Sequence, residues 1–247
     1  MRMVRRRDER GVVTLALDSP HNRNALSAPL VGHLGEELLA CGEDGDVRAI
    51  VLTHTGTTFS AGADLRQPPE PQTFVDLLRR IVTLPKPVVA RIEGRVRAGG
   101  LGLVGACDIA VASRTADFAF TEVRIGVAPA VISLPLLPRL DPRAAARYCL
   151  TGERFDAAEA ARMGLVTRVA EANGDVDEAL APVLDGLRRS APSALAATKE
   201  LLTARVRDAF ARDGARLADE SLRLFGSADA REGVTAFLER RDPAWVL

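Results

Sequence analysis

A cluster of glycines inside an apolar segment constrains the fold of this chain more than any other feature. In residues 88–126 (VVARIEGRVRAGGLGLVGACDIAVASRTADFAFTEVRIG) a β-branched run comes first, and Gly99, Gly100, Gly102 and Gly105 follow it. Glycine lets a backbone approach a ligand closely, and a glycine turn that opens a helix points free N–H groups at negative charge. The segment therefore predicts a strand, a turn and a short helix whose start stabilises an anion.

The same segment ends in a single carboxylate, Glu122, which has aromatic and aliphatic residues on both sides in the sequence. Apolar surroundings disfavour the charged form of a carboxyl group and raise its pKa, which suits a general base. The alternative is a surface carboxylate that pairs with Arg124 or Arg114. We expect this segment to stabilise an anion and to move a proton.

Composition narrows the class of protein. The 247 residues allow one large domain, or one domain with a helical appendage, and the formal net charge of zero does not favour nucleic acid as a partner. No apolar run predicts a membrane span or a signal peptide. The three cysteines are far apart, and no His or Cys spacing indicates a metal site. We expect a cytoplasmic protein with buried thiols, no metal and no membrane or nucleic-acid partner.

Strands and helices alternate in the first 140 residues, which favours parallel βαβ units. The predicted strands are 11–18 (paired with 4–7), 47–53, 88–92 and 109–112. A helix capped by Ser27 and another over 74–84 lie between them. Beyond about residue 142 the sequence predicts one strand, 165–169, and mostly helices. These helices are 143–150, 157–163, 176–189, 194–210, 215–225 and 229–240.

The glycine cluster also matches the G-x-G-x-x-G dinucleotide fingerprint over residues 100–105. That fingerprint requires a strand that runs directly into the glycines and a full helix after them. Here residues 93–98 separate the predicted strand from Gly99, and only about two helical turns fit before the next strand. We therefore expect no nicotinamide cofactor.

Short motifs spread from about residue 11 to 241 carry a more specific signal. They are NAL (24–26), FSAGADL (59–65), KPV (86–88), AGGLG (98–102), CDI (107–109), EVRIG (122–126) and DAREGVTAF (229–237). Together they resemble the enoyl-CoA hydratase/isomerase (crotonase) family. The resemblance implies an α/β fold, a ClpP-like crotonase spiral of ββα units. It also implies a core domain at 1–190, a C-terminal helical trimerisation region at 191–247, and assembly as a trimer or hexamer.

The resemblance further implies an acyl-CoA site in which two backbone N–H groups hold the thioester oxygen. By position these groups belong to Ala63 and Gly99. Negative charge builds on that oxygen as the α-carbon becomes enolate-like, and preorganised donors stabilise it. CoA enters as part of the substrate, and no separate cofactor is implied.

The same resemblance assigns residues to the CoA moiety. Arg23 would lie near the nucleotide phosphates, because a guanidinium suits an anion. The other CoA-binding residues that it implies are Ala25, Ala61, Asp64, Leu65, Phe237 and Arg240. The last two would reach CoA from the end of the chain or from a neighbouring copy. A solvated loop arginine, for Arg23, and plain helix packing, for Phe237 and Arg240, are the alternatives.

Hydratases of the family usually carry two glutamates, and this chain departs from that pattern. Glu122 matches the second glutamate, but Gly102 stands at the first position. This combination resembles the branch of methylglutaconyl-CoA-type hydratases. The backbone N–H of Ala130 would hold a water. The leading hypothesis is hydration of a 2-enoyl-CoA through Glu122. The alternatives are Δ3,Δ2-enoyl-CoA isomerisation, another thioester reaction, and a non-hydrating acyl-CoA-binding or scaffold protein.

Overall fold

The chain begins with a tight β-hairpin. The computed structural model describes residues 3–171 and 175–247, and in it β1 (Val4–Glu9) pairs antiparallel with β2 (Val12–Leu17). Arg10 and Gly11 between them have φ of 49° and 76°. Two central residues with positive φ match the twist of the strands they join. The predicted pairing of these segments is confirmed.

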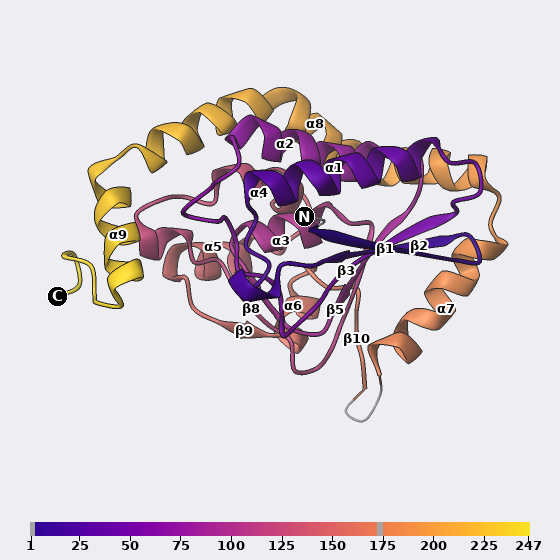
Figure 1. Cartoon of the computed structure of the whole chain (residues 1–247), viewed down its shortest axis with the longest axis horizontal. Coiled ribbons are helices and arrows are strands. Elements are labelled where there is room, and N and C mark those ends of the chain that lie inside the picture. Colours follow the sequence, from indigo (N-terminus) through magenta and orange to yellow (C-terminus); the bar gives the residue numbers. More distant parts are fainter. Residues whose placement is uncertain (1–2, 172–174) are drawn as a thin grey trace.

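Two sheets form the centre of the molecule (Figure 1). The larger sheet has the order β1-β2-β3-β5-β7-β10, and only β1 runs antiparallel to its neighbour. Its other members are β3 (Ala49–His54), β5 (Val88–Ile92), β7 (Ile109–Ala112) and β10 (Arg168–Val169). The smaller sheet contains β4 (Thr58–Ser60), β6 (Arg95–Arg97), β8 (Asp117–Ala119) and β9 (Phe155–Asp156). In it β4, β6 and β8 are parallel and β9 is antiparallel.

From β3 to β8, consecutive strands alternate between the two sheets. The pairs β3/β4, β5/β6 and β7/β8 each place one strand in the larger sheet and one in the smaller. The helices that follow these pairs are α2 (Pro71–Thr83), α3 (Gly99–Ala106), and η2 (Glu122–Ile125) with α4 (Ala130–Leu136). This arrangement is a spiral of ββα units, so the predicted fold class is confirmed. The predicted alternation of strands and helices did not include the smaller sheet. Its strands have at most three residues, which is too short to show a hydrophobic period.

The remaining helices are η1 (Pro20–Asn22), α1 (Ala28–Glu43), α5 (Pro142–Thr151), α6 (Ala157–Arg162), α7 (Val176–Arg189), α8 (Pro192–Phe225) and α9 (Ala228–Glu239). Ser27 caps α1 as predicted, because its Oγ accepts a hydrogen bond from Leu30 N. The break predicted between 194–210 and 215–225 is wrong. Gly214 lies inside one continuous α8, where a Cβ would stand 3.5 Å from Val75 Cγ1 of α2. The glycine faces α2 at an ordinary contact distance and does not end the helix.

The two faces of the larger sheet are covered by different helices. On one face α7 packs on Val51, Val89 and Val111. On the other face lies the main core, to which α8 contributes Val206 and Phe210 as it runs along α2 and α4 (Figure 1). The boundary near residue 191 remains a prediction, and α8 begins at Pro192. No helix within residues 3–171 and 175–247 is both long and apolar enough to cross a bilayer.

Candidate active site

Three loops leave the carboxyl ends of three neighbouring parallel strands of the smaller sheet. Ala63 follows β4, Gly99 follows β6 and Glu122 follows β8, each within three residues of the strand end. Ligands of open α/β sheets bind at the carboxyl ends of the strands. The fold therefore brings all three predicted catalytic residues to one edge of one sheet.

The Ala63 loop lies directly against the turn before Gly99. Gly62 has a φ of 91°, and a Cβ there would stand 2.8 Å from Ala98 Cβ and 3.6 Å from Gly99 N. On the other side Leu26 N donates to Gly62 O at 2.7 Å, and Asp64 N donates to Leu26 O at 3.1 Å. These bonds use the carbonyl of Gly62 and the N–H of Asp64, which flank Ala63. The N–H of Ala63 itself therefore points away from Leu26.

An unusual turn at Ala98 fixes the direction of the second N–H group, which belongs to Gly99. Ala98 has φ 45° and ψ −118°, a strained conformation for a residue with a Cβ. Its N–H donates to Ala119 O at 3.1 Å, which ties the turn to β8. Gly99 is the first residue of α3, so its N–H has no acceptor inside the helix. In the parts of the chain that the structure describes, no group accepts a hydrogen bond from the N–H of Ala63 or Gly99.

Glu122 is the buried acid at this edge. The residue is 8% exposed, and its Oε2 has no hydrogen-bond partner within the described residues. Burial raises the pKa of Glu122 to about 7. The surface alternative is wrong, because the carboxylate is inside and Arg124 donates instead to Thr151 O at 3.3 Å. A carboxyl group that titrates near neutrality can both take and return a proton.

An apolar wall occupies the position of a second acid. Gly102 lies one helical turn beyond Gly99, and a Cβ there would stand 2.6 Å from Ile132 Cγ2 and 3.4 Å from Leu78 Cδ1. Ile132 of α4 therefore fills the volume in which a glutamate at position 102 would begin. Ala130, at the start of the same helix, is buried, and its N–H donates to Ala128 O at 2.8 Å. A water at Ala130 N would compete with that bond.

The predicted CoA residues before position 66 lie together. Ala61 N donates to Arg23 O at 3.0 Å, and Arg23 itself is exposed. Asp64 is held locally: its Oδ1 accepts from Arg66 N at 2.9 Å, and its Oδ2 accepts from Asn22 Nδ2 at 3.2 Å. These bonds use the Asp64 side chain to shape its own loop and to tie that loop to the segment that holds Asn22. Ala25 and Leu65 belong to the same two segments.

A buried amide that the sequence reasoning did not single out joins these segments to the sheet. Asn24 Nδ2 donates to Thr55 O at 3.0 Å and to Thr58 O at 2.8 Å, while its Oδ1 accepts from Ser19 N at 2.7 Å. The side chain is fully buried. The available signal was an asparagine directly before Ala25 and Leu26 in an otherwise apolar motif.

The two late residues lie elsewhere in the chain. Phe237 is 60% exposed, and Arg240 caps the end of α9 with a φ of 57°. This helix packs on η2 and on the end of α8. Within one copy, Phe237 and Arg240 therefore belong to the helix that packs against the turn carrying Glu122. Their contact with CoA remains a prediction.

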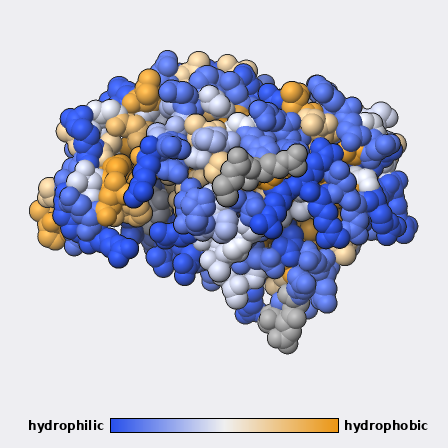
Figure 2. Space-filling view, in the orientation of Figure 1, coloured by the Kyte–Doolittle hydropathy of each residue, from blue (hydrophilic) through white to orange (hydrophobic). Residues whose placement is uncertain are grey.

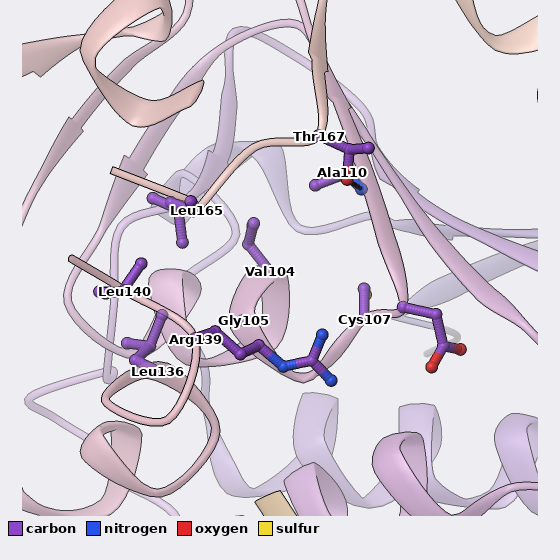
Figure 3. Close-up of a pocket in the computed structure, with 11 residues that line it drawn as sticks. Val104, Gly105, Cys107, Ala110, Leu136, Arg139, Leu140, Leu165 and Thr167 are labelled. Carbon is purple, nitrogen blue, oxygen red and sulfur yellow. Dashed lines mark hydrogen bonds between the residues drawn. The ribbon is translucent and has the colours of Figure 1, made fainter. Parts of the chain in front are cut away.

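A cavity of ≈ 40 Å³ lies at the opposite end of α3 from Gly99. Figure 3 shows the guanidinium of Arg139 reaching past Gly105 toward Cys107 in this cavity. Its Nε and Nη2 are buried and have no hydrogen-bond partner among the described residues. None of the predicted site residues lines it. Within residues 3–171 and 175–247, no group of three His, Cys, Asp or Glu side chains is placed to hold a metal ion.

Known proteins resemble this chain over nearly all of its length. The sequence profile described as "Enoyl-CoA hydratase/isomerase" matches residues 7–246. The carnitinyl-CoA dehydratase of Citrobacter koseri is 36% identical over 251 residues, covering 95% of this chain and 94% of the relative. Enoyl-CoA hydratase domain-containing protein 3 of Danio rerio is 32% identical over 252 residues, covering 95% and 84%. The crystal structure of an enoyl-CoA hydratase from Mycobacterium avium superposes with a TM-score of 0.91 at 51% identity, covering 99% of each chain.

Proposed function

Because the chain belongs to the enoyl-CoA hydratase/isomerase family, we propose that it adds water to the 2,3 double bond of a 2-enoyl-CoA. The thioester oxygen would accept hydrogen bonds from the N–H groups of Ala63 and Gly99, and Glu122 would carry the proton. One observation carries the proposal: at three neighbouring strand ends, two N–H groups have no acceptor and one oxygen of a buried carboxylate has no partner among the described residues.

Glu122 alone accounts for both proton transfers. Its carboxylate takes a proton from water while the water oxygen bonds to C3, and the electrons of the double bond move onto the thioester oxygen. The two N–H groups stabilise that negative charge. The protonated Glu122 then returns the same proton to C2 as the thioester carbonyl re-forms. A pKa of about 7 suits a group that is base in one step and acid in the next.

Isomerisation of a 3-enoyl-CoA is the second candidate, and the apolar wall at Gly102 favours it. With Ile132 Cγ2 at that position, no second carboxylate is present there to orient a water. In this reaction Glu122 would take a proton from C2 and return it at C4, with the same N–H groups holding the intermediate enolate.

Turnover assays separate these functions. Hydration of crotonyl-CoA or 3-methylglutaconyl-CoA lowers the absorbance of the enoyl thioester, and isomerisation of a 3-enoyl-CoA raises it. We expect hydration by the wild-type protein and a loss of about 10²–10⁴-fold in Glu122→Gln, because that variant lacks the proton carrier. Binding of a CoA thioester should change by no more than a few-fold.

A matched control is Glu178→Gln, which alters an exposed glutamate of α7. Full turnover by Glu122→Gln would overturn the assignment of the proton carrier. Isomerisation without hydration would select the second candidate. A new product from either substrate would indicate another thioester reaction, and binding without any reaction would indicate an acyl-CoA-binding or scaffold protein.

We further propose that residues 191–247 support a trimer or hexamer. Exposed apolar side chains gather on the C-terminal helices and tail, and Figure 2 shows hydrophobic surface at the end of the molecule where α9 lies. They are Leu201, Leu202, Leu222, Phe225, Phe237, Leu238, Trp245 and Val246. A solution mass of three or six times 26.4 kDa is expected, and a monomer would contradict it.

Three unpaired cysteines match a reducing compartment, so we propose the cytoplasm.

A further inference from the structure

Helix α9 rests on the turn that carries Glu122 through two contacts between backbones. A Cβ at Gly233 of α9 would stand 2.5–2.6 Å from the C, Cα and O atoms of Ile125. A Cβ at Gly126 would stand 2.4 Å from the carbonyl carbon of Asp229 and 2.7 Å from Ala230 N. No side chain fits at these distances, so glycine on both segments is what allows the contact.

The contacted residues belong to the same turn as the acid. Glu122 and Ile125 are the first and last residues of η2, one 3₁₀ turn apart. The carbonyl of Glu122 accepts a hydrogen bond from Val127 N at 3.2 Å, and Gly126 between them has a φ of 75°. A displacement of residues 125–126 is therefore passed directly to the backbone of Glu122.

The carboxyl group is held only in part by hydrogen bonds. Its Oε2 has no hydrogen-bond partner among the described residues, so this oxygen does not fix the position of the side chain. On the α5 side the contact is made by a side chain, in which Arg124 Nε donates to Thr151 O at 3.3 Å. On the α9 side the contact is between backbones, and the start of the helix is capped because Ser227 Oγ accepts from Ala230 N at 3.0 Å.

We propose that α9 positions Glu122, with Gly126 and Gly233 as the positioning residues that let the helix press on η2. This inference rests on the proposed function, in which Glu122 carries the proton. It assigns to the C-terminal helix a task in the chemistry of its own chain, apart from any part in assembly. The consequence is that backbone contact at α9, far along the sequence from Glu122, controls the rate of proton transfer.

The test is Gly233→Ala, because the added Cβ must push η2 away from α9. A misplacement of about 1 Å at a reacting group can lower turnover about 10²-fold, and we expect a fall of that order in kcat. Affinity for a CoA thioester should stay within a few-fold. A displaced turn admits water to the carboxylate, which lowers its pKa, so the acid limb of the kcat profile should move to lower pH.

The matched control is Gly226→Ala, at the junction of α8 and α9. A Cβ there would stand 3.5 Å from Arg223 O, an ordinary contact, so kcat and its pH profile should not change. A folded Gly233→Ala protein with wild-type kcat and pH profile would overturn the inference. If Gly233→Ala does not fold, Ser227→Ala loosens the start of α9 without adding an atom. It should shift kcat and the pH profile in the same direction by a smaller factor, and no shift would overturn the inference.

The double variant Glu122→Gln/Gly233→Ala separates this inference from the proposed function. If α9 acts through Glu122, the double variant should be no slower than Glu122→Gln alone. Additive losses would show that Gly233 acts elsewhere and would overturn the inference. Full activity of Glu122→Gln would remove the proposed function itself, whatever Gly233→Ala does.

Discussion

Two acids flank helix α3 and have opposite surroundings. Glu122, beside the start of α3, is 8% exposed and has an oxygen without a partner in the described residues. Asp108, just after the end of α3, accepts hydrogen bonds at its Oδ2 from Lys199 Nζ and Val88 N, both at 2.8 Å. Lys199 Nζ also donates to two backbone carbonyls. An acid whose charge is paired serves stability, whereas a buried acid with an unpartnered oxygen lowers stability and is a candidate for a functional site. Substitutions beside the two acids should therefore affect different measurements.

The largest effect is expected at the satisfied acid. Lys199→Met leaves Asp108 partly buried without its counter-charge, and breaking a buried ion pair costs about 3–5 kcal/mol of unfolding free energy. Urea unfolding measures the loss, while kcat per folded molecule should stay at the wild-type value. The double variant Asp108→Asn/Lys199→Met should recover part of the stability. A loss of kcat at full stability would contradict the separation between the two acids.

On the other side of the comparison, Gly62→Ala should affect turnover. Its Cβ would meet Ala98 Cβ at 2.8 Å and would push the Ala63 loop away from the Gly99 turn. Losing one donor to a developing oxyanion lowers kcat about 10²–10³-fold, and we expect a loss of that order. Gly32→Ala is the control, because a Cβ at Gly32 of α1 has open space around it. Equal kcat values for the two variants would show that the contact between the loops does not set the site.

The sequence was sufficient for the parts of this comparison that depend on local residues. The glycine cluster predicted a strand, a turn and a two-turn helix, and α3 has that length and place. Apolar neighbours predicted that Glu122 has a raised pKa, and its burial has this effect. The pairing of Ala63 with Gly99 came from family resemblance, because the strands that bring them together are too short to show a hydrophobic period.

Tertiary contacts were beyond the reach of such reasoning. Ile132 fills the space beside Gly102 from 30 residues away, and Gly233 meets Ile125 from more than 100 residues away. Neither contact leaves a local signal, since a glycine in a helix is equally compatible with open space. The C-terminal region shows the same limit, because the break predicted between 194–210 and 215–225 lies inside the continuous α8.

The burial of Glu122 also predicts how stability depends on pH. Its pKa rises from about 4.5 in the unfolded chain to about 7 in the folded protein, so the folded state binds more protons between these values. The resulting stabilisation is complete below pH 4.5 and is lost as the pH rises through 7. At 1.36 kcal/mol per pKa unit the loss is about 3 kcal/mol. Glu122→Gln should lack this slope in urea unfolding between pH 4.5 and 8, and Glu178→Gln should keep it. Parallel slopes for Glu122→Gln and wild type would contradict the burial of the charge.

The smallest expected effect concerns the apolar wall beside Gly102. Gly102→Glu places its Cβ 2.6 Å from Ile132 Cγ2, and such overpacking costs about 1–3 kcal/mol of unfolding free energy. In Gly102→Glu/Ile132→Ala that methyl group is gone and the remaining Cβ, 3.1 Å away, needs only a small shift, so stability should partly return. Ile132→Ala alone is the control for the cavity that it creates. If the missing second acid limits water addition, the double variant should hydrate a 2-enoyl-CoA faster than Ile132→Ala. A folded double variant with no gain would show that a carboxylate introduced at position 102 does not have the geometry to assist water addition.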